Sequence, residues 1–162
     1  MKVAFVMGSD SDLPVVERGV KTVKEFGVDV EVRVISAHRT PYRAEEFAKK
    51  AEENGIGVIV AAAGKAAHLG GVLAAFTTLP VIGLPIKSST LDGLDSLLSI
   101  VQMPPGIPVA TVAIDGAENA GILAVQILAT ADAGLKEKLK AYKEEMAKKV
   151  AQKDELVKAK FL

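Results

Sequence analysis

The sequence contains no cysteine among its 162 residues, which excludes disulfide bonds, a catalytic thiol and a metal site built on thiolates. Net charge is also lacking, because 20 Lys and Arg side chains balance 20 Asp and Glu side chains. This balance gives no support to binding of nucleic acid or of a membrane surface. No stretch reaches the roughly 18 uninterrupted apolar residues that a membrane helix needs, and the first apolar run is too short for a signal peptide. We therefore expect a cytoplasmic protein.

What the chain does have is enough apolar material for one substantial core. Hydrophobic residues make up 49% of the sequence, which excludes a disordered chain. The length suits one domain, and no linker, internal repeat or low-complexity stretch divides the chain. We therefore predict a single α/β domain over residues 1–162, in which residues 133–162 form a helical extension.

Apolar runs and amphipathic segments alternate five times, with short connections between them. Continuous apolar runs are typical of buried parallel strands, and apolar residues at helical spacing indicate covering helices. The alternation predicts a three-layer sandwich with a five-stranded parallel sheet, flavodoxin- or Rossmann-like. The segment 28–35 alternates valine with charged residues, which predicts a strand with one exposed face. We expect strands at residues 3–7, 28–35, 58–62, 81–84 and 109–114, and helices at residues 13–26, 41–54, 72–76, 91–101 and 118–131.

The C-terminal segment from residue 133 onward is rich in Lys and Glu. Its apolar residues recur at helical spacing, which predicts one amphipathic helix. This helix either packs on its own domain or reaches a neighbouring subunit, and both interpretations remain open from the sequence alone. The apolar stripe consists of Leu135, Leu139, Tyr142, Met146 and Val150.

The most informative segment runs from Ser36 to Pro41, directly after an expected strand. Ligands of open α/β sheets bind at the carboxyl ends of the strands. His38, one of two histidines in the chain, can give and take a proton near neutral pH. Arg39 can bind two oxygens of a phosphate or carboxylate. A structural hydrogen bond and a surface ion pair are the alternatives, but the position at a strand end favours chemistry on an anionic small molecule.

A second polar segment, from Gly8 to Asp12, connects the first expected strand to a helix. The free N–H groups of a helix N-terminus favour phosphate, and Ser9 and Ser11 add hydroxyl donors. Asp12 is placed to cap the helix; its charge would repel phosphate, so we expect it to face a hydroxyl or a ring N–H. A plain capping segment would look similar. The dinucleotide pattern G-x-G-x-x-G is absent.

A third segment, from Gly64 to Gly71, contains the second histidine, His68. Gly64 and Lys65 resemble the end of a P-loop, but its first glycine and its hydroxyl residue are missing, so we do not expect ATP binding by that device. His68 should reach the same rim of the sheet as His38. The small residues around it leave room for a ligand ring, or alternatively allow tight packing. Two histidines alone make a poor metal site, and we expect no metal.

Four motifs, in order and in register, resemble the N5-carboxyaminoimidazole ribonucleotide mutase family. The likeness extends from residue 1 to about residue 131. The motifs are Gly-Ser-Asp-Ser-Asp at 8–12, Ser-Ala-His-Arg-Thr-Pro at 36–41, Ala-Ala-His-Leu at 66–69 and Asp-Ser-Leu-Leu-Ser-Ile-Val-Gln-Met-Pro at 95–104.

The resemblance implies transfer of a carboxyl group from the exocyclic amine of an aminoimidazole ribonucleotide to ring carbon 4, in purine biosynthesis. It implies no ATP, metal or organic cofactor, and a homo-octamer with active sites at subunit contacts. That favours the second interpretation of the C-terminal helix. By resemblance, His38 shuttles the proton. The expected substrate-binding residues are Ser9, Asp12, Ser36, Arg39, Gly64, Lys65, His68 and Leu69.

The chain departs from the family at two positions. Lys65 and Gly70 stand where the family commonly has glycine and proline. A sister group, which carboxylates the aminoimidazole ribonucleotide directly with CO2, commonly carries a basic residue near position 65. His68 and the Val-Gln-Met-Pro run at 101–104 fit the mutase better. A non-catalytic nucleotide-binding module is a third possibility, against which His38 beside Arg39 argues.

Overall fold

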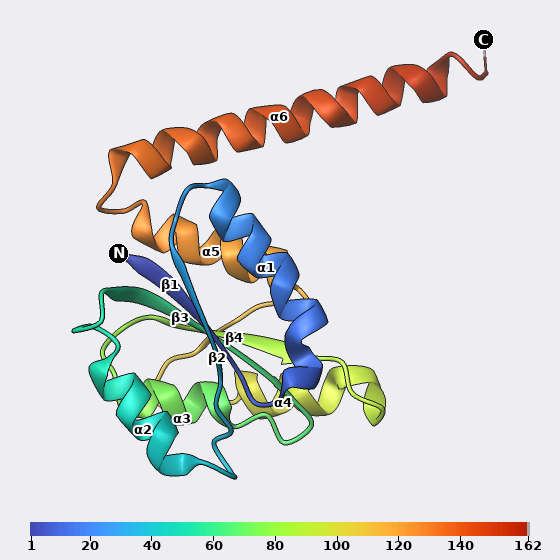
Figure 1. The fold of residues 1–162 in the computed structure, drawn as a ribbon. Coiled ribbons are helices and arrows are strands. Elements are labelled where there is room, and N and C mark those ends of the chain that lie inside the picture. The colour runs from blue at the N-terminus through green and yellow to red at the C-terminus, as the bar shows by residue number, and fades with distance from the viewer. Residues whose placement is uncertain (162) are drawn as a thin grey trace.

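The computed structural model describes residues 1–161 and confirms the predicted α/β architecture. Five parallel strands form one sheet in the order β2-β1-β3-β4-β5 (Figure 1), which is the flavodoxin-like order. Buried apolar runs form its three inner strands, as expected for a sheet that is covered on both faces. The strands are β1 (Lys2–Met7), β2 (Val30–Val34), β3 (Ile56–Gly64), β4 (Val81–Ile86) and β5 (Ala110–Thr111).

Helices cover both faces of the sheet and produce two apolar cores. Helices α1 (Leu13–Glu25) and α5 (Ala117–Leu128) cover one face, where Phe5 is fully buried. On the other face, α2 (Pro41–Lys50), α3 (Leu69–Ala75) and α4 (Leu94–Val101) pack over the small residues of β1 and β3. Two short 3-10 turns, η1 (Asp10–Asp12) and η2 (Leu91–Gly93), precede α1 and α4.

Three expected helices are shorter than predicted, and the one expected at 118–131 ends at Leu128. The second ends at Lys50 and not near residue 54, because residues 51–55 form turns that close at Gly55 with φ 77°. The helix expected at 91–101 is interrupted at Gly93, whose φ is 95°. Asp12 precedes α1 as predicted, but its side chain makes no capping hydrogen bond. Ser9 caps the short turn η1 instead, because its hydroxyl accepts the N–H of Ser11.

Both edge strands are shorter than predicted, whereas β3 extends past its expected bounds at both ends. The strand expected at 109–114 covers only Ala110–Thr111, although the N–H of Val112 still donates to the Gly83 carbonyl at 3.0 Å. The prediction that β2 has one exposed face was incomplete, since Val32 and Val34 on its α1 side are 40% and 51% exposed. An edge strand has a neighbouring strand on one side only and lies at the margin of the sheet. Helices therefore cover it less fully than they cover β1 or β3.

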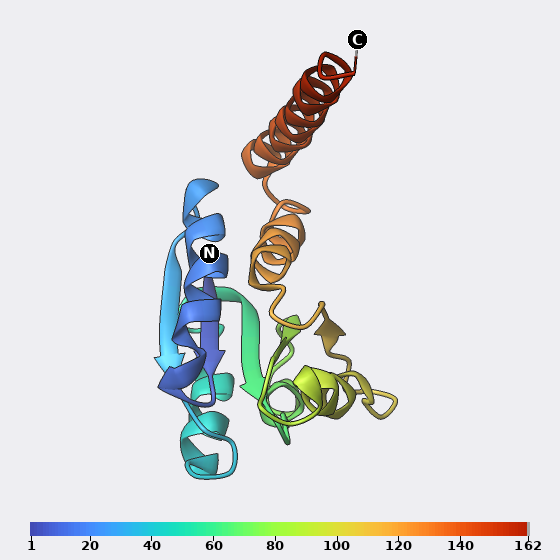
Figure 2. The same ribbon diagram turned by 90° about the vertical axis from the view of Figure 1, so that its right-hand side faces the viewer.

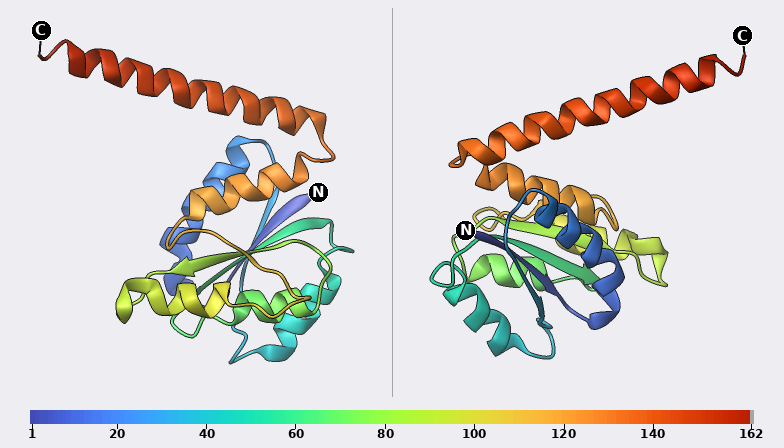
Figure 3. Two further views of the ribbon diagram at one scale, coloured as in Figure 1. Left: turned by 180° about the vertical axis from the view of Figure 1, so that it is seen from behind. Right: turned by 45° about the horizontal axis from the view of Figure 1, so that its top comes forward.

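Helix α6 (Ala133–Lys158) has a packed half and a free half. Leu135 is buried, the Tyr142 ring lies 5.4 Å from the Phe26 ring, and the Lys138 ammonium donates to the Phe26 carbonyl at 2.7 Å. The C-terminal half of the helix extends past the other elements, as Figures 2 and 3 show, and its apolar side chains from Met146 onward are exposed. Within residues 1–161, no helix combines the length and apolar character needed to cross a bilayer.

Candidate active site

The loops that follow β1, β2, β3 and β4 surround a cavity of about 520 Å³ at the carboxyl edge of the sheet. The strand order reverses between β1 and β3, and such a switch point leaves a crevice that binds ligands in open α/β sheets. Every site residue predicted from the sequence lines this cavity. They are Ser9, Asp12, Ser36, His38, Arg39, Gly64, Lys65, His68 and Leu69.

The two histidines meet across the cavity, as the sequence suggested. His38 Nε2 and His68 Nδ1 are 3.0 Å apart, and the rings are nearly perpendicular at 86°. At this distance one ring nitrogen donates a hydrogen bond and the other accepts it, so at least one imidazole is neutral. A neutral imidazole beside a second imidazole can accept a proton from a ligand and return it.

A rigid loop between β2 and α2 presents His38 and Arg39. Ser36 and Thr40 close this loop through reciprocal hydrogen bonds: the Thr40 hydroxyl donates to the Ser36 carbonyl at 2.9 Å and accepts the Ser36 N–H at 3.1 Å. Arg39 then donates from Nη2 to the Gly8 carbonyl at 2.8 Å and from Nε to the Ser36 hydroxyl at 3.3 Å. The guanidinium is therefore held between the loops after β1 and β2, beside the cavity.

Asp12 contributes a buried carboxyl group to the wall formed by the loop after β1. Its side chain is 8% exposed, and burial raises the pKa of Asp12 above its ordinary value of 3.8, although a hydrogen bond from the Ser11 hydroxyl opposes that rise. The Ser9 and Ser11 hydroxyl oxygens lie 2.9 Å apart nearby. Hydroxyl donors next to a carboxylate acceptor suit a ligand that carries both an anionic group and hydroxyl groups.

Lys65 occupies an unusual backbone conformation at the end of β3. Its φ is 56°, in the left-handed region that favours glycine. Neither Lys65 nor Arg39 forms an ion pair with any side chain among residues 1–161. Two unpaired cations beside a cavity favour a ligand that carries negative charge.

The fourth loop, after β4, supplies cavity residues that the sequence analysis missed. Lys87, Ser88 and Ser89 lie on this wall together with Ile86. Their position in the sequence is a signal that could have found them, because they follow directly on the carboxyl end of β4, as the other site residues follow their strands. In the described part of the chain, no group of three or more His, Asp or Glu side chains is arranged to hold a metal ion.

A comparison with family models identifies the chain's relatives. The model described as AIR carboxylase matches residues 2–149. The chain belongs to the AIR carboxylase family. Among curated members, the N5-carboxyaminoimidazole ribonucleotide mutase of Pyrococcus abyssi is 65% identical over 145 residues, which cover 90% of this chain and 83% of that protein. The enzyme of the same name from Thermotoga maritima is 58% identical and covers 94% of this chain and 89% of its own length.

Solved structures of this family have the same fold. The crystal structure of Treponema denticola PurE superposes with a TM-score of 0.86 at 29% identity and covers 94% of this chain and 95% of that one. The family resemblance inferred from four sequence motifs is therefore confirmed by comparisons that extend over nearly the whole chain.

Proposed function

We propose that this chain is an N5-carboxyaminoimidazole ribonucleotide mutase of purine biosynthesis. The observation that carries the proposal is the pairing of His38 with His68 at 3.0 Å in a cavity that also contains Arg39. Relatives of this name align with nine tenths or more of the chain at 58–65% identity. Their names favour the mutase over a direct carboxylase and over a non-catalytic nucleotide-binding module.

The proposed reaction needs one proton carrier and no net proton. The exocyclic nitrogen loses the carboxyl group and gains a proton, whereas ring carbon 4 gains the carboxyl group and loses a proton. His38 protonates the nitrogen as its bond to carbon breaks, and the resulting neutral imidazole removes the proton from carbon 4. His68 Nδ1 accepts the hydrogen bond from His38 Nε2 and so orients the ring throughout, and His38 Nδ1 carries the proton that is transferred.

The remaining residues bind the ribonucleotide. Arg39, with the Ser9 hydroxyl and the Ser36 loop, provides donors for the phosphate. Asp12 accepts hydrogen bonds from ribose hydroxyls or the ring amine. Gly64 and Leu69 border the space for the imidazole ring, and Lys65 provides a counter-charge for the carboxyl group that moves.

The decisive experiment supplies each candidate substrate to the purified protein. We expect turnover of the carboxyamino ribonucleotide without added bicarbonate. Turnover of the uncarboxylated ribonucleotide alone, and only at high bicarbonate, would assign the chain to the direct carboxylases. Binding of either ribonucleotide without turnover would leave the non-catalytic module as the function.

We also propose that the working form is a homo-octamer in the cytoplasm. Two apolar surfaces support self-association, because a monomer would leave both in water. One is the outer face of η2 and α4, with Leu91, Leu94, Leu98 and Val101 from 45% to 67% exposed. The other is the free half of α6, with Met146, Val150, Leu156 and Val157 from 43% to 68% exposed.

Charge substitutions on the free half of α6 test this assembly in the full-length chain. We expect Val150→Glu combined with Leu156→Glu to lower the mass measured by light scattering and to lower activity with it, if the active sites need neighbouring subunits. Ala151→Glu, an exposed position on the same helix but on the side away from these apolar residues, is the matched control. A fully assembled and active double variant would show that this surface has no part in the octamer.

A further inference from the structure

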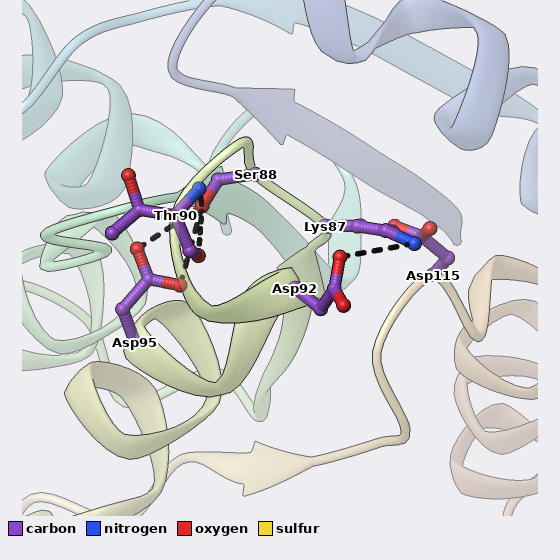
Figure 4. Close-up of polar contacts among 6 residues, drawn as sticks. All are labelled: Lys87, Ser88, Thr90, Asp92, Asp95 and Asp115. Atoms are coloured by element: carbon purple, nitrogen blue, oxygen red, sulfur yellow. Dashed lines mark hydrogen bonds and ion pairs between the residues drawn. The ribbon is translucent and has the colours of Figure 1, made fainter.

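Lys87 has a main chain that is fixed on both sides and an ammonium group that is weakly held. On one side, its backbone N–H donates to the Asp115 carboxylate at 2.8 Å. Asp115 has φ 55°, and its own carbonyl accepts a hydrogen bond from Arg18 Nη2 at 2.9 Å, which connects this point to helix α1. Figure 4 shows Asp115 beside Lys87.

The anchor on the other side of Lys87 is Ser88. Its hydroxyl donates to the Thr90 carbonyl at 2.8 Å and lies 3.1 Å from an Asp95 carboxylate oxygen, in the first turn of α4 (Figure 4). The main chain at Lys87 is therefore held between its own bond to Asp115 and the bonds that the next residue, Ser88, makes with Thr90 and Asp95. A lysine whose backbone is fixed at the rim of a cavity can deliver its charge to a repeatable place.

The ammonium group, in contrast, contacts one exposed carboxylate. Lys87 Nζ lies 3.2 Å from Asp92 Oδ1, and the Asp92 side chain is 86% exposed. Ion pairs this open to solvent contribute only about 0–1 kcal/mol. Asp92 is also presented by a strained segment, since Leu91, Asp92 and Gly93 have successive φ values of 51°, 53° and 95°. An anionic ligand in the cavity can therefore replace Asp92 as the partner of Lys87.

We infer that Lys87 is a further anion-binding residue of the cavity, in addition to Arg39 and Lys65, and that the Asp92 carboxylate pairs with its ammonium group when no ligand is bound. Arg39 follows β2 and Lys87 follows β4, so the two cations lie at opposite ends of the row of strands β2-β1-β3-β4. A ligand with two anionic groups, such as the carboxylated ribonucleotide of the proposed function on which this inference rests, can then contact cations at both ends of the cavity, with Lys65 between them at the end of β3. Asp92 then competes with the ligand for Lys87.

A double-mutant cycle tests this competition. We expect Lys87→Met to weaken binding of the carboxylated ribonucleotide about tenfold or more, as loss of a charge-assisted hydrogen bond does. Asp92→Asn should tighten the same binding about two- to fivefold, because the competing carboxylate is gone. In the Lys87→Met background, Asp92→Asn should have no further effect. Lys49→Met, which removes an equally exposed ion-paired lysine from the last turn of α2, should leave binding unchanged.

Three ligands identify the group that Lys87 binds: the carboxylated ribonucleotide, its uncarboxylated form and its dephosphorylated nucleoside. The ligand that lacks the group should be insensitive to Lys87→Met. Equal loss for all three ligands, no loss for any, or an Asp92→Asn effect that persists without Lys87 would overturn the inference. If the wild-type protein binds no ribonucleotide, the proposed function fails separately. Titration with inorganic phosphate and with acetate then tests the role of Lys87 separately. That role requires Lys87→Met to bind at least one of these two anions more weakly than the wild-type protein does.

Discussion

The two edges of the sheet use the left-handed backbone conformation differently. At the amino edge, the turns that enter β2 and β3 use Gly27 and Gly55, with φ 78° and 77°. At the carboxyl edge, four non-glycine residues have φ between 51° and 56°: Lys65, Leu91, Asp92 and Asp115. Glycine adopts this conformation freely, whereas another residue costs about 1–2 kcal/mol.

This difference indicates that the carboxyl edge keeps strained non-glycine residues because their side chains are needed there, at a cost in stability. At the amino edge the turns only reverse the chain, and glycine does so without strain. At the carboxyl edge Lys65 and Lys87 line the cavity, Asp115 fixes the backbone of Lys87, and Asp92 pairs with its ammonium. Backbone strain often concentrates at functional sites. We therefore expect substitutions at the two edges to separate activity from stability.

The largest expected effect is a loss of catalytic activity caused by a substitution at the carboxyl edge. His38→Asn should lower turnover about 10²–10⁴-fold, because a proton carrier is lost, while ribonucleotide binding remains detectable and the melting temperature changes little. Steady-state kinetics, isothermal titration and thermal unfolding measure the three quantities. A variant within a few-fold of wild-type turnover would contradict the role given to His38.

The next effect is on the stability of the amino edge. Gly55→Ala should lower the free energy of unfolding by about 1–2 kcal/mol, because alanine must adopt the left-handed conformation. No heavy atom outside its chain neighbours lies within 4 Å of the position a Cβ would occupy there, so the penalty comes from the backbone alone. Denaturant unfolding measures it.

Gly55→Asn provides the graded control, since asparagine tolerates this conformation better than alanine. We expect a smaller loss of stability for Gly55→Asn than for Gly55→Ala, and turnover per folded molecule should be unchanged in both. A fall in turnover without a fall in stability would mean that the amino edge is not the purely structural region described above.

A smaller effect of opposite sign is expected at Lys65. Lys65→Gly should raise the free energy of unfolding by about 0.5–1 kcal/mol, which is the relief of strain less the greater entropy of glycine in the unfolded chain. It should also weaken binding of the carboxylated ribonucleotide. Lys65→Ala removes the same ammonium but keeps the strain, so it should weaken binding equally without any gain in stability. Unchanged binding in both variants would show that Lys65 does not contact the ligand.

The features that follow from local sequence pattern could be predicted, and those that depend on tertiary position could not. The buried runs of β1 and β3, with the polar segments that follow three strand ends, were enough to predict that His38, Arg39 and His68 share one edge of the sheet. The length of β5 was overestimated, because the turn at Asp115 depends on contacts with β4 and α1. The contribution of Lys87 was missed because its neighbours carry no motif in the sequence.

The smallest effect concerns Asp12, where stability and function should again oppose each other. Burial raises the pKa of Asp12 above 3.8, so the folded protein binds this proton more tightly than the unfolded chain does. The resulting stability is present below the ordinary pKa and is lost as the pH rises through the folded pKa. Above the folded pKa the ionised, buried carboxylate therefore lowers the free energy of unfolding. Asp12→Asn should relieve this penalty and so raise the free energy of unfolding, by a smaller amount than the changes expected for Gly55→Ala and Lys65→Gly. It should also weaken ribonucleotide binding.

The pH dependence separates this explanation from a simple change in packing. The stability difference between Asp12→Asn and the wild-type protein should be near zero well below pH 3.8, should grow as the pH rises from there through the folded pKa, and should be constant above it, because only the wild-type side chain ionises. Denaturant unfolding of both proteins across this range measures the difference. A difference that is the same at every pH would mean that the amide stabilises the fold through new contacts and that ionisation of the buried Asp12 carries no penalty.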